Sequence, residues 1–410
     1  MSERRIVVAG GGAAGIFAAI ACAEAAPESK VLVVEKSSQF LSKVRISGGG
    51  RCNVTHACFD ARELSEHYPR GGPALRGPLQ VFQPRDTMSW FEHRGVLLKT
   101  EQDGRVFPKS DSSQTIIDCL LHAAREARVE LSANRGLERV VRKNGGGFAV
   151  SLKGREDVEC DRLMLATGGC RAAAAGQLAA SLGHTIEPPA PSLFTFHIAS
   201  PWLRELAGVS LESVEVSIPG LALRERGALL ITHTGLSGPA ILRLSAWGAR
   251  ELHKLDYQFP IRVNWTPELE PDAIVRRFES CRRAHPARLL VNTSMTPLPA
   301  RLWERLVRAA GIPRETRWAE LSRGTRHDLL QQLINMRLDA VGRSLNQDEF
   351  VTCGGVRLGE VNFKTMESRV CPGLHFGGEL LDIDGVTGGF NFQAAWTTGW
   401  IAGTAMARSR

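Results

Sequence analysis

Three consecutive glycines, Gly10–Gly12, end a short apolar run near the start of the chain. The run Arg5–Ala9 predicts a buried strand, and the alanine-rich stretch after Gly15 has helical spacing to about Ala25. A second apolar run, Val31–Val34, predicts another strand. Strand, tight turn, helix and strand in this order predict a βαβ unit, which places the fold in the α/β class.

The glycines in this cluster have the spacing Gly-x-Gly-x-x-Gly, and at each of the three positions there is a physical reason for a glycine. Gly10 permits a tight turn, Gly12 lets the backbone approach a pyrophosphate, and Gly15 lets the helix pack closely on the strand. The N-terminus of the helix offers unpaired N–H groups to an anion. Glu35 follows the second strand, twenty residues beyond Gly15, where its carboxylate would accept hydrogen bonds from ribose hydroxyls. The unit therefore predicts dinucleotide binding.

Length and composition are those of an ordinary globular chain. Its 410 residues are 43% hydrophobic and 23% charged, which suffices for two or three structural units. The apolar stretch Ile16–Ala26 is too short to span a bilayer and neither end has a lipidation signature, so we expect a cytoplasmic protein without membrane association. Nine scattered cysteines without a CxxC pair indicate free thiols in a reducing compartment. Cys52, His56 and Cys58 lack a second ligand pair, so we expect no metal site.

The fingerprint alone does not separate FAD from NAD, and three further segments favour FAD. They are the loop Ser47–Asn53 with its three adjacent glycines, the apolar strand Leu163–Leu165 that leads into Ala-Thr-Gly-Gly, and the segment 373–393. Adjacent glycines are costly in a regular element, so the first loop is expected to approach a flat or charged group closely, with a plain flexible loop as the alternative. The last segment joins a strand, an acidic loop and a helix that starts after Gly388-Gly389 and runs to about Ala407.

The start of this last helix has a chemical use. Reduced flavin carries negative charge around N1 and the C2 carbonyl, and the N–H groups at the positive end of a helix suit that charge. Glu379, which precedes the acidic loop of this segment, is expected to hold the ribityl hydroxyls. A turn before a packed helix is the structural alternative. Together the segments predict FAD, with the flavin between the N-terminal loop and the last helix, and leave a nicotinamide-only dehydrogenase as the less favoured alternative.

Seven long motifs make the comparison with a known family specific. In chain order they are SGGGRCNVTH (Ser47–His56), DGRVFP (Asp103–Pro108), ATGG (Ala166–Gly169), THTGLSGPAIL (Thr232–Leu242), CGGVRLGEV (Cys353–Val361), KTMESR (Lys364–Arg369) and GGELLDIDGVTGGFNFQAAW (Gly377–Trp396). The chain resembles, over nearly its whole length, the bacterial aminoacetone-oxidase-like family of FAD-binding proteins. That family includes 3-dehydro-bile-acid reductases and a flavin-dependent ribosomal RNA dihydrouridine synthase.

The resemblance implies an α/β fold, namely a split Rossmann-like FAD domain of glutathione-reductase type with an inserted domain. The insert would consist of a β-barrel-like unit and a small helical unit. On this chain the FAD domain would comprise residues 1–190 and 346–410, and the insert residues 191–345.

Local patterns in the sequence agree with an insert of this kind. The proline cluster Pro188–Pro191 predicts a border between domains. The segments Val214–Ile218 and Ile261–Val263 alternate as strands do, and Pro299–Arg343 has helical periodicity.

The resemblance also implies which residues contact FAD. His56 stands where many relatives have Asn, so no role is assigned to it. The expected cofactor contacts are Gly10, Gly12, Ala13, Ala14, Gly15, Glu35, Lys43, Gly49, Arg51, Cys52, Gly168, Gly378, Glu379, Gly389, Phe390 and Asn391.

Three residues are candidates for catalysis. Because a flavin carries the electrons, the protein must position a substrate carbon and supply or accept a proton. Cys52 is the first candidate for the proton donor, with a buried cysteine packed under the ring as the alternative. Arg51 is expected to orient an anionic substrate or oppose charge on the flavin, and His233 is either a second acid/base group or a structural turn residue. The sequence contains one dinucleotide fingerprint, so NAD(P)H is expected to dock transiently at the flavin as electron donor or to have no role.

The net charge of +8 is concentrated in one stretch. Between Pro271 and Leu345 there are fourteen arginines, no lysine and seven acidic residues. A stretch of this kind is more often a solvated helical face, but RNA phosphates require such charge, so it is also a candidate RNA-binding surface. Trp303 and Trp318 lie among these arginines and could stack on bases, although core packing is the more expected use.

These observations favour a FAD-dependent oxidoreductase, specifically a reductase that passes hydride from FAD to an activated carbon–carbon double bond. The substrate would be a small enone or a uridine in ribosomal RNA. A FAD-dependent amine oxidase ranks lower because the sequence shows no aromatic cage and no obvious amine-binding carboxylate. A non-catalytic, flavin-bearing RNA-binding factor is the third alternative, and the oligomeric state stays open.

Overall fold

The computed structural model describes residues 4–154, 157–170, 173–294, 297–344 and 351–408. Its chain divides into two compact units, one formed by Met1–Ser192 with Asn346–Arg410 and the other by Leu193–Leu345. The first unit is thus built from both ends of the chain, and the second is inserted between them. Within the described ranges, no helix is both long and apolar enough to cross a membrane.

The first unit is organised around a seven-stranded sheet. In spatial order its strands are β19 (Val361–Asn362), β20 (Glu367–Ser368), β21 (Leu374–Phe376), β10 (Arg162–Leu165), β1 (Arg5–Ala9), β2 (Lys30–Val34) and β6 (Glu130–Ser132). The five strands from β21 to β6 pair in parallel. At the other edge, β20 pairs antiparallel with both β21 and β19. The central strand β1 is an apolar run because parallel strands are covered on both faces.

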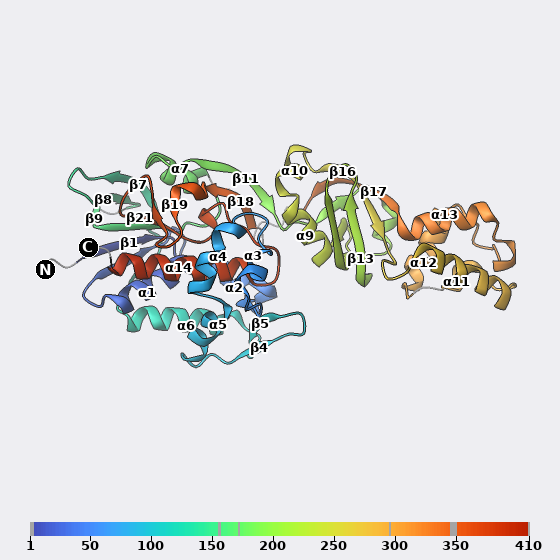
Figure 1. Ribbon diagram of the computed structural model, residues 1–410, viewed down its shortest axis with the longest axis horizontal. Coiled ribbons are helices and arrows are strands. Elements are labelled where there is room, and N and C mark those ends of the chain that lie inside the picture. The colour runs from blue at the N-terminus through green and yellow to red at the C-terminus, as the bar shows by residue number, and fades with distance from the viewer. Residues whose placement is uncertain (1–3, 155–156, 171–172, 295–296, 345–350, 409–410) are drawn as a thin grey trace. The chain divides into compact units, whose positions relative to one another are not determined.

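The helices from the two ends of the chain lie against each other. Figure 1 shows α1 (Ala13–Ala25) and α14 (Phe390–Arg408) side by side. A Cβ atom at Gly399 of α14 would overlap the carbonyl oxygen of Ala14 in α1, so a glycine is required for this approach. The contact brings the glycine-rich start of the last helix into the same unit as the N-terminal fingerprint.

The other elements of the first unit form smaller layers. Two three-stranded antiparallel sheets have the orders β3-β5-β4 and β7-β8-β9, and β11 pairs with β18 where the chain leaves and re-enters the unit. The bounds are α2 (Ser42–Gly50), β3 (Thr55–His56), α3 (Ala61–Ser65), α4 (Gly72–Val81), α5 (Pro84–Glu92), β4 (Leu98–Thr100), β5 (Arg105–Pro108), α6 (Ser113–Glu126), β7 (Leu137–Arg142), β8 (Phe148–Leu152), β9 (Val158–Cys160), α7 (Ala173–Ser181), β11 (Ile186–Ser192) and β18 (Val351–Val356).

The second unit contains a closed barrel and a group of helices. The barrel order is β12 (Phe196–Ile198), β15 (Gly235–Ser237), β14 (Leu223–Ile231), β13 (Ser210–Ile218), β16 (Gln258–Asn264) and β17 (Met336–Arg343). The helices are α8 (Pro201–Arg204), α9 (Pro239–Trp247), α10 (Ala249–Lys254), α11 (Pro271–Ala284), α12 (Ala300–Ala309) and α13 (Arg323–Ile334). The α/β fold with an inserted barrel is therefore confirmed.

One expectation for the second unit needs correction. The helical periodicity of Pro299–Arg343 ends at Ile334, and Met336–Arg343 forms strand β17 instead. Its burial alternates with period two because β17 closes the barrel between β12 and β16. Trp303 and Trp318 are both fully buried, which agrees with core packing, the more expected of their two uses, and leaves no face on which a base could stack.

Candidate active site

The N-terminal fingerprint forms an open turn at the start of α1. Gly10 has a positive φ of 115°, and side chains at Gly10 or Gly15 would overlap backbone carbonyl oxygens. A Cβ at Gly12, by contrast, would meet no heavy atom within 4 Å. Gly12 caps α1 without a side-chain hydrogen bond, so the N–H groups of the first turn face this open space. This turn, Gly10–Gly15 with the first N–H groups of α1, is called the cradle below, and it has the form that a pyrophosphate requires.

Glu35 lies beside this turn, directly after β2. Its Oε2 accepts a hydrogen bond from the Gly11 N–H at 2.8 Å. Its Oε1 accepts from the N–H and the hydroxyl of Ser37 at 2.8 and 2.9 Å. Three donors therefore hold the carboxylate at the edge of the cradle, in the position where the sequence predicts a ribose contact.

The strands β10 and β21 end at the same edge of the sheet as β1 and β2, since all four are parallel. Gly168, after β10, has a φ of 78°, and a Cβ there would meet no heavy atom within 4 Å. The buried Thr167 hydroxyl has no hydrogen-bond partner among the described residues. An open glycine and an unsatisfied hydroxyl at this edge are features that a bound ligand would complete.

Lys43 and Glu379 meet in an ion pair, although 336 positions separate them in the chain. The other oxygen of Glu379 accepts a hydrogen bond from the Thr352 N–H at 2.8 Å. The structure thus brings together two of the predicted cofactor contacts, and Thr352 fixes one of them.

The glycine-rich loop Ser47–Asn53 overlaps the end of α2, where the backbone departs from helical geometry, and it leads into residues that contact the start of α14. Gly48, Gly49 and Gly50 all have positive φ, which explains why this segment needs glycines. The Asn53 amide oxygen, in the orientation that satisfies the side chain, accepts from the Gly389 N–H at 3.0 Å. A Cβ at Gly389 would come within 2.6 Å of the Thr55 carbonyl oxygen. The loop and the helix start, distant in sequence, therefore form one surface.

Phe390 and Asn391 have internal partners at this helix start. The Phe390 ring stacks on both His56 and His67, with ring centroids 4.7 and 4.3 Å away, and the two histidine rings are 6.1 Å apart. The Asn391 amide exchanges two hydrogen bonds with Gly385, at 2.8 and 2.9 Å. Both side chains therefore shape the loop before α14, and they bear on a cofactor through the backbone that they hold.

Cys52 lies in the glycine-rich loop with a φ of 61° and is fully buried. Burial raises the pKa of its thiol to about 12, partly opposed by a hydrogen bond with Ser47. A thiol with this pKa is protonated at neutral pH but gives up its proton reluctantly. The position favours the packing alternative over the role of proton donor.

Arg51 extends toward the hairpin of β4 and β5. Its guanidinium is 2.8 Å from Glu101 and 3.8 Å from Asp111, and it lies 4.1 Å from the centre of the Phe107 ring. Glu101 also pairs with Arg105 and Asp111 with Lys99, so Arg51 belongs to a network of alternating charges. The arrangement favours a role in fixing the glycine-rich loop to the hairpin.

His233 belongs to the barrel unit, in the turn before β15, where it is exposed. The neighbouring Thr232 hydroxyl accepts hydrogen bonds from the N–H groups of Thr234 and Gly235, at 3.4 and 3.1 Å. These bonds hold the turn without the imidazole, which leaves the His233 ring free of a structural task within the turn.

The chain matches the HI0933-like protein Rossmann domain family over residues 4–405. It belongs to this family. Members are FAD-dependent oxidoreductases, so the sequence-based predictions of the family, of FAD and of an oxidoreductase are confirmed. All nine cysteines are free thiols, and seven of them are buried.

Two relatives match over almost their whole length. The chain is 31% identical to the ribosomal RNA dihydrouridine synthase of Escherichia coli (strain K12), over 96% of each chain. It is 29% identical to the 3-dehydro-bile acid delta(4,6)-reductase of Clostridium scindens, over 98% of this chain and 99% of the relative.

Among solved structures, the fold is similar to the 3-ketosteroid-delta4-(5alpha)-dehydrogenase of Rhodococcus jostii RHA1. The TM-score is 0.52 at 14% identity, covering 100% of this chain and 98% of the other. A 3-ketosteroid delta1-dehydrogenase from Sterolibacterium denitrificans also gives a TM-score of 0.52, at 12% identity and 99% coverage of both chains. At these identities the likeness shows the fold.

The residues of the cradle fit FAD. The open backbone at Gly12 suits the pyrophosphate, and the carboxylate of Glu35 suits the adenosine ribose. Sequence reasoning missed Asn53, Thr167 and Thr352. Asn53 and Thr167 lie inside the quoted motifs, so the sequence could have indicated them. Thr352 contributes its backbone N–H, which every residue except proline has, so its residue type gives no indication of this role.

Proposed function

We propose that the protein is a FAD-dependent reductase that saturates a carbon–carbon double bond conjugated to a carbonyl group, and that its substrate is a uridine in ribosomal RNA. When bound, FAD supplies hydride chemistry. Dihydrouridine is uridine with its C5–C6 bond saturated, and a delta(4,6)-reductase also saturates carbon–carbon double bonds. The two relatives, so named, therefore share one reaction type on two different substrates.

The residues of the chain would hold and stabilise the reacting ring. The first-turn N–H groups of α14 and the positive end of its dipole suit negative charge that develops on a reduced flavin. Asn53 ties this helix start to the glycine-rich loop through Gly389. We propose that Cys52 and Arg51 support that loop, by packing and by the ion pair with Glu101.

The observation that carries the RNA assignment is the arginine face of α11. Arg276, Arg282 and Arg283 are exposed, and none of them forms an ion pair within the described part of the chain. Arg288, just beyond the helix, is exposed in the same way. Because Trp303 and Trp318 are buried, contact with RNA at this unit would rest on phosphates and would depend steeply on salt.

A small enone is the second candidate substrate. The 29% identity to the bile acid reductase extends over 98% of this chain, which is close to the match with the RNA enzyme. If an enone is the substrate, the arginine face of α11 serves solubility, and RNA is neither bound tightly nor modified.

We propose NAD(P)H as the electron donor, docking transiently at the flavin. The first test follows the flavin absorbance of the purified protein under anaerobic conditions, with NADH or NADPH added first. The reduced protein is then mixed with ribosomal RNA fragments, with a 3-keto-4-ene steroid, or with air. Reoxidation by RNA, with uridines heavier by two hydrogens in mass spectrometry, supports the proposal. Reoxidation by the steroid alone favours the enone, and rapid reoxidation by air alone favours an oxidase.

A variant separates RNA binding from flavin chemistry. Changing Arg276, Arg282, Arg283 and Arg288 to Ala should weaken RNA binding and reduce its salt dependence while flavin content stays unchanged. The matched control is Arg125→Ala, which removes an exposed arginine of α6 in the other unit. Unchanged RNA affinity in the fourfold variant would remove the α11 face from the assignment.

A further inference from the structure

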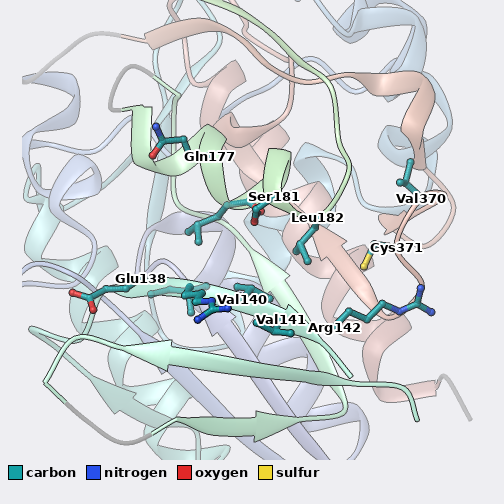
Figure 2. Close-up of a pocket in the computed structure, with 12 residues that line it drawn as sticks. Glu138, Val140, Val141, Arg142, Gln177, Ser181, Leu182, Val370 and Cys371 are labelled. Atoms are coloured by element: carbon teal, nitrogen blue, oxygen red, sulfur yellow. Dashed lines mark hydrogen bonds between the residues drawn. The ribbon is translucent and has the colours of Figure 1, made fainter. Parts of the chain in front are cut away.

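A cavity separate from the FAD cradle lies in the first unit, between the edge strand β7 and helix α7, and is called the groove below. Its volume is about 810 Å³, within the roughly 300–1,000 Å³ range of small-molecule sites. Figure 2 shows β7 below and the side chains of α7 above, with Val370 and Cys371 closing one side. None of the predicted FAD contacts lines this cavity.

The wall formed by Val370 and Cys371 is held in place. The Ser368 hydroxyl oxygen accepts hydrogen bonds from the N–H groups of Val370 and Cys371, at 2.9 and 2.7 Å. The same hydroxyl hydrogen-bonds the buried His184 ring nitrogen Nε2 at 2.7 Å. The opposite wall, β7, is paired along its length with β8. The groove is therefore built by fixed elements, as binding sites usually are.

The lining of the groove is mixed: Gln177 and Ser181 of α7 contribute polar atoms, and an apolar strip lies beside them. Val140 and Leu178 are buried, and Leu182 is partly exposed beside them. Val141 and Val370 are 44% and 45% exposed, which leaves apolar area open at the rim. An apolar ligand body would cover this area.

The charges of the groove are arranged along its axis. Figure 2 places Glu138 at one end and Arg142 at the other, where the guanidinium lies near Cys371. Arg139 also lines the cavity. Neither Arg139 nor Arg142 forms an ion pair or a side-chain hydrogen bond with any residue that the structure describes. An unpaired guanidinium beside an apolar groove fits a carboxylate, which it can hold by two parallel hydrogen bonds.

The groove and the FAD cradle lie at opposite ends of the parallel strands: the groove is near their amino ends and the cradle is at their carboxyl ends. Val370 and Cys371 precede β21, whereas Gly377 and Gly378 follow it at the edge that carries the cradle. A ligand in the groove would therefore not displace the cofactor and would not be the molecule that reacts at it.

We propose that this groove is a second ligand site, which binds an elongated apolar molecule with a single carboxylate. The carboxylate lies at Arg142, away from Glu138, and the apolar chain lies along Val140, Leu178 and Leu182. This proposal does not depend on which substrate the flavin site reduces.

The test is isothermal titration of the flavin-loaded protein with decanoate, and with 1-decanol and decylamine as probes of the same length. We expect saturable binding of one decanoate, and clearly weaker binding of the two other probes. Arg142→Ala should weaken decanoate binding about tenfold or more. Leu182→Trp should abolish it by filling the groove. Flavin absorbance of each variant reports that the fold is retained.

Arg125→Ala serves as control, because it removes an exposed arginine of α6 that does not line the groove. It should bind decanoate as the unchanged protein does. Equal binding of decylamine, unchanged affinity in the Arg142→Ala protein, or the lack of saturable binding by decanoate would each overturn the proposal.

Discussion

The backbone at Gly12 offers a substitution that separates cofactor binding from folding. A Cβ at this position would meet no protein atom within 4 Å, and the residue has φ −84° and ψ −171°, which alanine adopts without strain. If the pyrophosphate of FAD lies against this backbone, the methyl group of Gly12→Ala would occupy the ligand's space. The variant should therefore fold normally and bind FAD poorly.

The size of each effect follows from the local geometry. Because alanine is a poorer N-cap than glycine, the apoprotein should lose at most about 1 kcal/mol in free energy of unfolding. An extra methyl group in a filled contact costs about 1–3 kcal/mol. That cost corresponds to a Kd for FAD that is roughly 5–150-fold higher.

Titration of the flavin-free protein with FAD, followed by the quenching of flavin fluorescence, measures the Kd. Urea unfolding of the same preparation measures its stability. Gly77→Ala is the matched control, because a Cβ at Gly77 also meets open space but lies on α4, outside the cradle. A Kd for Gly12→Ala within twofold of the unchanged protein, at normal stability, would refute the placement of the pyrophosphate at Gly12.

Three further substitutions test packing, titration and charge. Gly399→Val should lower the free energy of unfolding, measured in urea, by at least about 2 kcal/mol, because its side chain would overlap the Ala14 carbonyl group. A loss below 0.5 kcal/mol (about one RT) would contradict the close contact of α1 and α14. Burial lowers the pKa of His375 to about 4, below the value of about 6.5 in an unfolded chain. The stability from this neutral imidazole is therefore full above pH 6.5 and falls by about 3 kcal/mol toward pH 4, and His375→Phe should remove that part of the pH dependence in urea unfolding. Arg282→Glu combined with Arg283→Glu should weaken RNA binding at least about tenfold at low salt in filter binding, and an unchanged slope against salt would count against phosphate contacts there.

The nucleotide-binding half of the fold could be predicted because its signals are local. The strand predicted at Arg5–Ala9 has those bounds in the structure, and the helix predicted to about Ala25 ends there. The last helix, predicted to about Ala407, ends at Arg408. In each case the apolar period and the glycine positions belong to one short segment, so the sequence carries the whole signal.

Prediction from sequence is limited where distant segments decide the structure. The periodicity of Pro299–Arg343 predicts a helix for Met336–Arg343 because the same window contains α12 and α13, but pairing with the two neighbouring strands of the barrel makes this segment a strand. The tryptophans among the arginines of the insert lie in a core that no local pattern reveals. Burial depends on which elements pack together, and that information is spread over the entire chain.

By itself, the sequence determined the βαβ unit, the type of cofactor and the concentration of charge in the insert, because steric demands on glycine and the period of apolar residues act over a few neighbouring positions. Only the tertiary structure joined Asn53 to Gly389, set Arg51 against the hairpin carboxylates and opened the groove between β7 and α7. These features need segments that are far apart in the chain to meet. The partner of a side chain is chosen by packing, which a local pattern does not encode.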